Sequence, residues 1–387
     1  MNILFFMNHY PDSRNGGIEN VTRILSEQFV ELGHSVHIRY LYDSMFDHSE
    51  DAIFKSCIQI DRSNILTQIG SAVDSYNIDF VINQSILSKS HILKKAIEGL
   101  DCKLITVYHN KPTLEPPTVK DIIRSLDLSL LKKIIILFTY PLFAYRSRIK
   151  LKRCHQRSYL VSDYTALLSK QFIPEYTKIM DVVSDKLVFF NNPIRDELIS
   201  SLQDLEEKEN TVLMVTRLDE KQKCIIKALK IWEKVNSDIP NWKLQIVGSG
   251  PDEMLIKNYA CKNNIKNVEF YSAQDPIEFY RKSSIFLMTS RSEGWGCTLT
   301  EAMRLIGVPI VIGTYLAVYD IIDDDKNGLI IKHSSEENDI ENCSNAILLL
   351  AKDKSKRQKM ALNARKKSEQ FSAKVIAKQW INFFERR

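Results

Sequence analysis

The chain has 387 residues, of which 44% are hydrophobic and 26% are charged, and its formal net charge is +5. This length and composition indicate a globular protein of about two domains and exclude a disordered or fibrous chain. No run of 18 apolar residues is present, so no transmembrane helix is expected, and residues 1–7 lack the basic start of a secretory signal. The seven cysteines are scattered, which disfavours a disulfide framework or a zinc site and predicts a cytoplasmic protein.

Short apolar runs rich in β-formers alternate with amphipathic stretches along the whole chain, which predicts parallel α/β sheets. The strands predicted in the first half are Ile3–Met7, Val36–Tyr40, Phe80–Asn83, Leu104–His109, Tyr159–Ser162 and Leu187–Phe190. Those predicted in the second half are Val212–Thr216, Leu244–Val247, Val268–Tyr271, Ile285–Thr289, Pro309–Ile312 and Leu329–Ile331.

Residues 118–157 form a basic segment, with ten Lys/Arg against two acids, while the rest of the chain carries a small negative charge. This asymmetry predicts a local anionic partner and argues against nucleic-acid binding. Within the segment, residues 131–145 are apolar and aromatic but contain Pro141, and the run is too short to cross a bilayer. We expect residues 131–157 to lie on an anionic membrane surface; the alternative is a core helix followed by a solvated basic helix.

The polar stretch 194–210 separates the two series of strands and is interpreted as the interdomain linker. The predicted organisation is an N-terminal Rossmann-like domain over 1–195 and a second Rossmann-like domain over 196–370. Residues 371–387 read as a final helix with one apolar face, which could cross back to the first domain.

Unusual residues occur where predicted strands end, which is where open parallel sheets bind ligands. They are Gly16 and Gly17 after the first strand, His109, Arg217, Gly248, and the loop Glu293-Gly-Trp-Gly296. Their distribution over both domains predicts a site in the cleft between them. Gly16 and Gly17 precede a helix, a natural position for phosphate, although a simple turn would look the same.

Several of these signals also have purely structural explanations. Gly248-Ser-Gly250 lacks a third glycine and is more simply a turn than a dinucleotide site. Glu301 could complete a capping box with Thr298, whereas Glu293 has no such structural reason. Asp323-Asp324-Asp325 could hold a metal, but the following turn sequence favours an exposed acidic turn. His109 could be a core histidine.

Taken in order, these motifs resemble retaining glycosyltransferases of family 4, which have the GT-B fold of two Rossmann-like domains facing across a cleft. The resemblance spans nearly the whole chain. It rests on Arg217 to Lys223, Gly248-Ser-Gly250, Glu293 followed by Glu301, Gly307-Val-Pro309, Asn327-Gly328, the N-terminal Gly16-Gly17, and Tyr108-His109-Asn110. Cys224 and Ile306 depart from the family, in which small residues are usual.

The resemblance implies a role for each candidate residue. Arg217 and Lys223 would hold the donor diphosphate in place of a metal. Whether Lys221 or Lys223 reaches the diphosphate is left open. Glu293 would contact the transferred sugar and Glu301 the ribose. The backbone at Gly296, Cys297, Thr298 and Leu299 would face phosphate. Gly17, with Gly16, would let the N-terminal loop approach the sugar phosphate, and His109 would lie near the anomeric centre on the acceptor side.

The implied activity is transfer of a hexosyl group from a nucleotide-diphosphate sugar to a glycan or lipid-linked acceptor, with retention and without a metal or other cofactor. A bacterial surface-polysaccharide pathway and a peripheral location on the inner face of the membrane are expected by analogy. The competing interpretations are a GT-B nucleotide-sugar epimerase, a non-catalytic nucleotide-sugar binding protein, and an NAD-dependent oxidoreductase, which the missing G-x-G-x-x-G disfavours. Truncation of Glu293 is expected to cost little stability.

Overall fold

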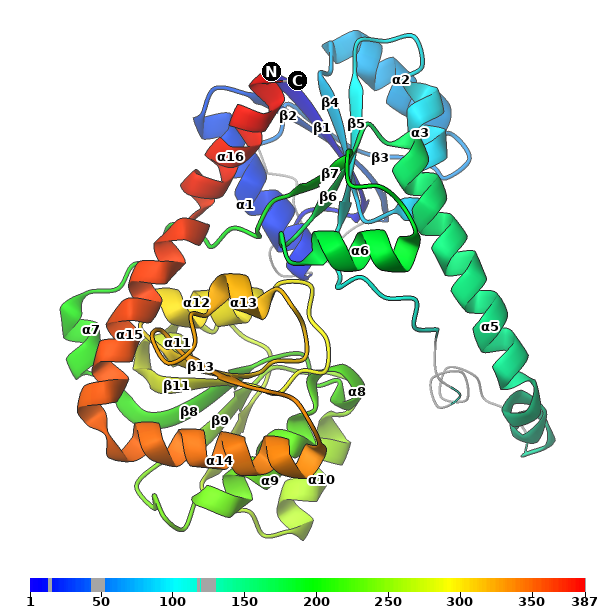
Figure 1. The fold of residues 1–387 in the computed structure, drawn as a ribbon. Coiled ribbons are helices and arrows are strands. Elements are labelled where there is room, and N and C mark those ends of the chain that lie inside the picture. The colour runs from blue at the N-terminus through cyan, green and yellow to red at the C-terminus, as the bar shows by residue number, and fades with distance from the viewer. Residues whose placement is uncertain (13–15, 43–52, 117–118, 120–129, 387) are drawn as a thin grey trace. The chain divides into compact units, whose positions relative to one another are not determined.

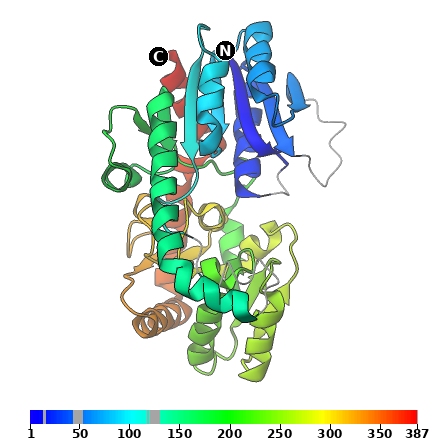
Figure 2. The same cartoon turned by 90° about the vertical axis from the view of Figure 1, so that its right-hand side faces the viewer.

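Two parallel sheets organise the chain, with helices packed around each (Figures 1 and 2). The computed structural model describes residues 1–12, 16–42, 53–116, 119 and 130–386. The chain divides into two compact units. The N-terminal unit comprises Met1–Glu19, Val30–Leu167 and Phe172–Phe189, and the C-terminal unit comprises Asn20–Phe29, Leu168–Gln171 and Phe190–Arg387.

The sheet of the N-terminal unit has seven parallel strands in the order β3-β2-β1-β4-β5-β6-β7. Its strands are β1 (Asn2–His9), β2 (Ser35–Tyr42), β3 (Ser56–Gln59), β4 (Phe80–Gln84), β5 (Lys103–Tyr108), β6 (Tyr164–Leu167) and β7 (Leu187–Phe189). The helices in this stretch of the chain are α1 (Gly17–Glu31), α2 (Ile65–Tyr76), η1 (Leu87–Lys89), α3 (Ser90–Ala96), α5 (Leu130–Val161) and α6 (Phe172–Met180). Of these, α1 is divided, because its residues Asn20–Phe29 belong to the C-terminal unit.

The sheet of the C-terminal unit has six parallel strands in the order β10-β9-β8-β11-β12-β13. Its strands are β8 (Glu209–Val215), β9 (Lys243–Val247), β10 (Val268–Tyr271), β11 (Ser283–Met288), β12 (Val308–Ile312) and β13 (Leu329–Ile331). The first helices are α7 (Leu202–Glu206), α8 (Glu220–Lys223), α9 (Ile225–Val235), α10 (Glu253–Lys262), α11 (Ile277–Lys282) and α12 (Cys297–Arg304). They are followed by α13 (Val318–Ile321), α14 (Glu336–Lys352), α15 (Lys354–Ser368), η2 (Glu369–Phe371) and α16 (Ala373–Glu385).

Both sheets have the strand order of a Rossmann fold, which confirms the predicted α/β class. In each sheet the order reverses beside the first strand, between β1 and β4 and between β8 and β11. Ligands of open α/β sheets bind outside the carboxyl ends of the strands at this switch point. The loops after these four strands are therefore where a site is expected.

One predicted strand is wrong, and one observed strand has no counterpart in the prediction. Tyr159–Ser162 is not a strand, because α5 continues to Val161 and buries His155 and Ser158 on its inner side. The strand follows at Tyr164–Leu167. Edge strand β3 was not predicted, because its four residues are half-buried or exposed and lack an apolar alternation.

The stretch 194–210 contains more structure than a linker requires. Helix α7 lies within it, with a capping box at Ser201 and Asp204, and β8 already begins at Glu209. Lys208 Nζ donates to the carbonyls of Tyr280 and Leu305 at 2.8 and 2.6 Å. This segment is thus packed into the C-terminal unit. The predicted tail helix is α16, whose buried residues include Trp380 and Phe384.

Three buried histidines of the N-terminal unit predict acid sensitivity. Burial lowers the pKa of His37, His109 and His155 from 6.5 to about 4, with Arg39 adding to the effect at His37. Because the pKa of these histidines is lower in the folded chain than in the unfolded chain, the unfolded chain binds protons at a higher pH as the solution is acidified. Stability is therefore present above pH 6.5 and is lost as the pH falls toward 4. We expect each histidine to cost about 2 kcal/mol by pH 5 relative to pH 7.5, measured by urea melts. A flat stability profile between these pH values would contradict this.

Candidate functional site

Most of the predicted site residues lie in two loops at the carboxyl edge of the six-stranded sheet or on the helices that follow these loops. One loop leads from β8 through residues 216–219 into α8, and the other leads from β11 through residues 289–296 into α12. These strands are neighbours and flank the switch point of the sheet. The topology therefore brings Arg217 and Lys223 to the same edge as Glu293.

Lys223 and Glu293 form an ion pair at the centre of this edge. Lys223 Nζ lies 2.6 Å from Glu293 Oε1, and the two side chains are only 17% and 11% exposed. The loops are held together beside the pair, because Gln222 Nε2 donates to Ser292 O at 3.1 Å and Arg291 N donates to Gln222 O at 2.8 Å. A cation and a carboxylate are thus fixed side by side.

The backbone after Lys223 explains one departure from the family. Cys224 links α8 to α9 with φ 51° and ψ 50°, the left-handed conformation that favours glycine and costs other residues about 1–2 kcal/mol. Thr289 at the end of β11 donates to the carbonyls of Lys223 and Cys224 at 2.9 and 3.0 Å. Ile306, the second departure, also has a positive φ of 62°. At both positions the difference from the family affects the backbone conformation and does not change a chemical group of the site.

Arg217 and Lys221 are more exposed than Lys223. The Arg217 side chain is 61% exposed, and its Nη2 lies 2.7 Å from Asp219 Oδ2. Lys221 is also exposed. Of the two lysines that the sequence left open, Lys223 is the one paired with Glu293.

Helix α12 starts directly after the loop that carries Glu293. Gly296 is its N-cap, with φ +100°, and a Cβ there would come within 3.1 Å of Tyr315 Oη. Leu299 N already donates to Gly296 O at 3.0 Å. Cys297 and Thr298 are in the first turn, where backbone N–H groups have no intrahelical acceptor. Burial raises the pKa of the Cys297 thiol to about 12, which disfavours the nucleophilic thiolate.

The predicted capping box of Thr298 and Glu301 is not formed. Gly296 is the N-cap, and the Glu301 carboxylate accepts a hydrogen bond from Tyr280 Oη at 3.1 Å. Burial raises the pKa of Glu301, against the opposing effects of Arg195 and Tyr280. Glu301 therefore has no capping role, and its hydrogen-bond partner Tyr280 could not be predicted from the sequence.

Gly248 and Gly250 have a structural reason. Gly248 has φ +146°, and a Cβ there would lie 1.9 Å from Thr216 O. A Cβ on Gly250 would lie 2.5 Å from Leu218 O. The loop after β9 thus packs directly against the loop after β8, so glycine is required here whether or not Gly248 also meets a ligand.

Asp323, Asp324 and Asp325 form a turn. Asp324 Oδ1 accepts from Ile330 N at 2.8 Å. Asp325 pairs with Lys356 at 2.6 Å, and Asp323 with Lys367 at 3.4 Å. Within the described residues no group of three or more potential metal ligands occurs.

The remaining predicted residues belong to the N-terminal unit. Gly16 and Gly17 follow β1, and Gly17 begins α1. Within the described part of the chain, a Cβ on Gly17 would meet no atom of a more distant residue within 4 Å. His109 is buried at the end of β5, with Nε2 2.5 Å from Gln84 Oε1. Because the amide oxygen can only accept, His109 donates from Nε2 and keeps an acceptor lone pair on Nδ1.

Next to Gln84, Ser85 has φ 64° and accepts from His109 N at 3.2 Å. Sequence reasoning missed both residues, although Gln84 ends β4 and Ser85 follows it at the switch point of the sheet.

Two parallel sheets of Rossmann order define the GT-B class, and solved structures agree. The chain superposes over its whole length on Anabaena Alr3699/HepE, solved in complex with UDP and glucose, with a TM-score of 0.73, 12% identity and 100% of both chains covered. This similarity confirms the GT-B fold.

Residues 196–367 match the family Glycosyl transferases group 1. An uncharacterised glycosyltransferase of Haemophilus influenzae is 31% identical over 155 residues, 39% of this chain and 42% of its own. The poly(glycerol-phosphate) alpha-glucosyltransferase of Bacillus subtilis is 28% identical over 206 residues, 52% of this chain and 30% of its own. The chain thus spans less than half the length of these curated relatives.

Proposed function

We propose that the protein is a retaining glycosyltransferase of family 4 that moves a hexosyl group from a nucleotide-diphosphate sugar to a glycan or lipid-linked acceptor. The observation that carries the proposal is the Lys223–Glu293 ion pair beside the start of α12, at the switch point of the C-terminal sheet. The family match of residues 196–367, the UDP and glucose held by a protein of the same fold, and the glucosyltransferase relative support it.

The chemistry follows from where charge develops. Breaking the glycosyl–phosphate bond places negative charge on the diphosphate and positive charge on the sugar. Arg217, Lys223 and the N–H groups at the start of α12 would stabilise the leaving group as fixed charges and dipoles. A diphosphate competes with Glu293 for Lys223, which would release the Glu293 carboxylate to accept hydrogen bonds from sugar hydroxyls. Glu301 would bind the ribose.

Retention needs no protein nucleophile in this scheme. The acceptor hydroxyl enters on the face that the diphosphate leaves and passes its proton to the departing phosphate, unlike the double displacement of two-carboxylate hydrolases. His109 is proposed to lie near the anomeric centre as a neutral imidazole, because burial lowers its pKa to about 4. Gly17 would leave room for the sugar phosphate, since among the described residues a Cβ there would meet no atom within 4 Å other than those of its chain neighbours and its own helix backbone.

Nucleotide binding tests the proposal directly. UDP or GDP at 100 times its dissociation constant should stabilise the chain by about 2.7 kcal/mol, seen as a rise in Tm, whereas NAD should give no rise. Product analysis with a responsive nucleotide sugar then separates transfer from epimerisation and from binding without turnover. A rise with NAD and none with UDP or GDP would overturn the proposal.

The proposal includes independence of a metal and of any other cofactor. Two cations, Arg217 and Lys223, already lie at the proposed diphosphate site, and the acidic turn 323–325 is engaged with lysines. The rise in Tm with UDP or GDP should therefore be the same in excess EDTA as in Mg²⁺. Loss of the rise in EDTA, restored by Mg²⁺ or Mn²⁺, would return Asp323 and Asp325 to consideration as ligands.

We further propose that helix α5 binds an anionic membrane surface, which would place the protein on the cytoplasmic face near a lipid-linked acceptor. The N-terminal part of α5 extends beyond the sheet of its unit (Figure 1). Phe138 and Tyr145 there are 83% and 63% exposed, and Leu142 between them is also exposed. These residues share one helix face at spacings of four and three.

The following turns of α5 carry the cations. Arg146, Lys150, Arg153 and Arg157 recur at spacings of four, three and four and are all exposed, so they form one basic stripe. Lys152 is instead 3.8 Å from Asp181. Lys120 and Arg124 lie outside the described residues, as do the side chains of Lys132 and Lys133. No helix in the described part of the chain is long and apolar enough to span a bilayer.

A further inference from the structure

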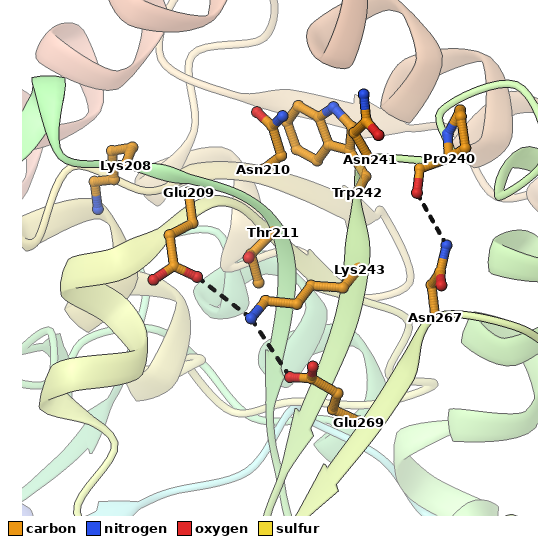
Figure 3. Close-up of a pocket in the computed structure, with 10 residues that line it drawn as sticks. All are labelled: Lys208, Glu209, Asn210, Thr211, Pro240, Asn241, Trp242, Lys243, Asn267 and Glu269. Carbon is orange, nitrogen blue, oxygen red and sulfur yellow. Dashed lines mark hydrogen bonds and ion pairs between the residues drawn. The ribbon is translucent and has the colours of Figure 1, made fainter.

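A polar groove lies at the amino edge of the C-terminal sheet, where β8, β9 and β10 begin (Figure 3). Its volume is about 630 Å³, within the range of ligand pockets. Arg217 and Gly248 follow the opposite ends of β8 and β9. Since β8 runs from Glu209 to Val215 at about 3.3 Å per residue, the groove is about 20 Å from the proposed donor site. It is a separate feature of the same unit.

An ammonium between two carboxylates forms the floor of the groove. Lys243 Nζ lies 3.3 Å from Glu209 Oε2 and 3.6 Å from Glu269 Oε2, as Figure 3 shows. Gln245 and Tyr271 donate to the same Glu269 oxygen at 2.7 and 2.8 Å. The three charged side chains are 34–44% exposed, so they are ordered by their partners but remain within reach of a ligand.

Neutral donors and acceptors complete the lining. Asn267 donates from Nδ2 to Pro240 O at 3.2 Å, which turns its amide oxygen to accept from elsewhere. Asn210 and Asn241 contribute further amides. Thr211 is 1% exposed, yet its buried hydroxyl has no hydrogen-bond partner within the described part of the chain. A buried unpaired hydroxyl is unfavourable, and a water or a ligand hydroxyl in the groove would supply a partner.

The charges of the groove decide between ligand classes. Glu209 and Glu269 would repel a phosphate or nucleotide, and the Lys243 ammonium between them would repel a metal ion. A purely apolar ligand would leave these groups desolvated without partners. A neutral polyhydroxylated ligand suits them, because each hydroxyl both donates to carboxylates and accepts from an ammonium or amide. Trp242 also lines the groove, but it is 5% exposed and lies under the Arg357 guanidinium at 5.1 Å, so it adds little apolar surface and the polar groups would supply the recognition.

We propose that this groove binds a neutral stretch of a glycan chain, as a second saccharide site remote from the site of transfer. The choice of a glycan as the polyhydroxylated ligand rests in part on the proposed function. The groove would hold a distant part of an acceptor or product chain, and so would favour long acceptors over short ones.

The test uses the full chain and isothermal titration with maltohexaose, isomaltohexaose and the hexasaccharide of chitin, each up to about 10 mM, a range that detects millimolar affinity. We expect at least one to bind, and the double variant Glu209→Gln/Glu269→Gln to weaken that binding at least tenfold. The matched control is Glu336→Gln/Glu341→Gln, which makes the same charge change at two exposed ion pairs on α14 and should leave binding unchanged.

Any of three outcomes would overturn the proposal. The first is that no hexasaccharide binds, and the second is that Glu209→Gln/Glu269→Gln binds as tightly as the parent. The third is binding of inorganic phosphate that Lys243→Met abolishes, because an anion site would then occupy the groove. The rise in Tm with UDP is measured in parallel and should not respond to the groove variants. A chain that binds a hexasaccharide but no UDP or GDP would refute the proposed function and leave the groove proposal standing.

Discussion

Replacing Glu293 by alanine is expected to lower kcat for sugar transfer by at least about 100-fold, the usual cost of removing one preorganised polar group from an active site. Glu293 and Lys223 are held together between two loops at the carboxyl edge of the sheet. The variant removes the carboxylate proposed to meet the transferred sugar while Arg217 and Lys223 remain for the diphosphate. UDP should therefore still raise the Tm, and the loss should appear in kcat.

The same variant is expected to lose stability, which revises the expectation from sequence alone. Glu293 is 11% exposed and neutralises a lysine that is 17% exposed, so truncation leaves a mostly buried ammonium without its partner. The cost should be about 1–3 kcal/mol, measured by urea unfolding, and UDP should offset part of it by engaging Lys223. Glu293→Gln, which keeps the shape, should show the kinetic loss with less destabilisation.

Glu336→Ala is the matched control for Glu293→Ala. Glu336 also pairs with a lysine at 2.6 Å, but the side chains of Lys230 and Glu336 are 38% and 56% exposed. Exposed pairs contribute little, so this variant should leave both kcat and stability unchanged. If Glu293→Ala transfers sugar at nearly the parental kcat, Glu293 does not belong to the active site.

The strands could be predicted from sequence wherever both faces of the sheet are covered. β4, β11 and β12 are buried at every residue, and each contains an uninterrupted apolar run that is visible in the sequence. Edge strand β3 is half-buried or exposed and leaves no such run. The residues before β6 look like a strand locally, but burial of His155 and Ser158 keeps them in α5. That choice is made by tertiary packing, which local patterns do not contain.

The candidate site could also be predicted only in part. Charged residues and glycines at strand ends could be found from the sequence, because parallel topology brings all carboxyl ends to one edge. The hydrogen-bond partners of those residues could not be predicted. Glu301 bonds to Tyr280, 21 positions earlier, and His109 to Gln84, 25 positions earlier. Each partner lies on a different element, so identifying it requires the register and facing of both elements.

Reversing the basic stripe of α5 is expected to abolish binding to anionic vesicles. The variant replaces Arg146, Lys150, Arg153 and Arg157 by glutamate, all of them exposed on one helix face. Each basic residue near an anionic surface contributes about 1 kcal/mol, so the loss of four should weaken binding at least about 100-fold. Binding of the parent chain should require anionic lipid and fall with salt, as measured by vesicle flotation.

The control for this reversal changes the same number of charges on another helix. Lys352, Lys354, Lys359 and Lys366 of the C-terminal unit are exposed at the end of α14 and along α15, and their replacement by glutamate alters the net charge equally. If the basic stripe of α5 causes the binding, this control variant still floats with anionic vesicles. If the net charge of the whole chain causes it, neither variant floats. A second arm, Phe138→Ser with Tyr145→Ser, removes two exposed aromatic rings and should weaken binding without changing its salt dependence. If the parent chain ignores anionic vesicles at low salt, α5 is a solvated helix and the membrane proposal is wrong.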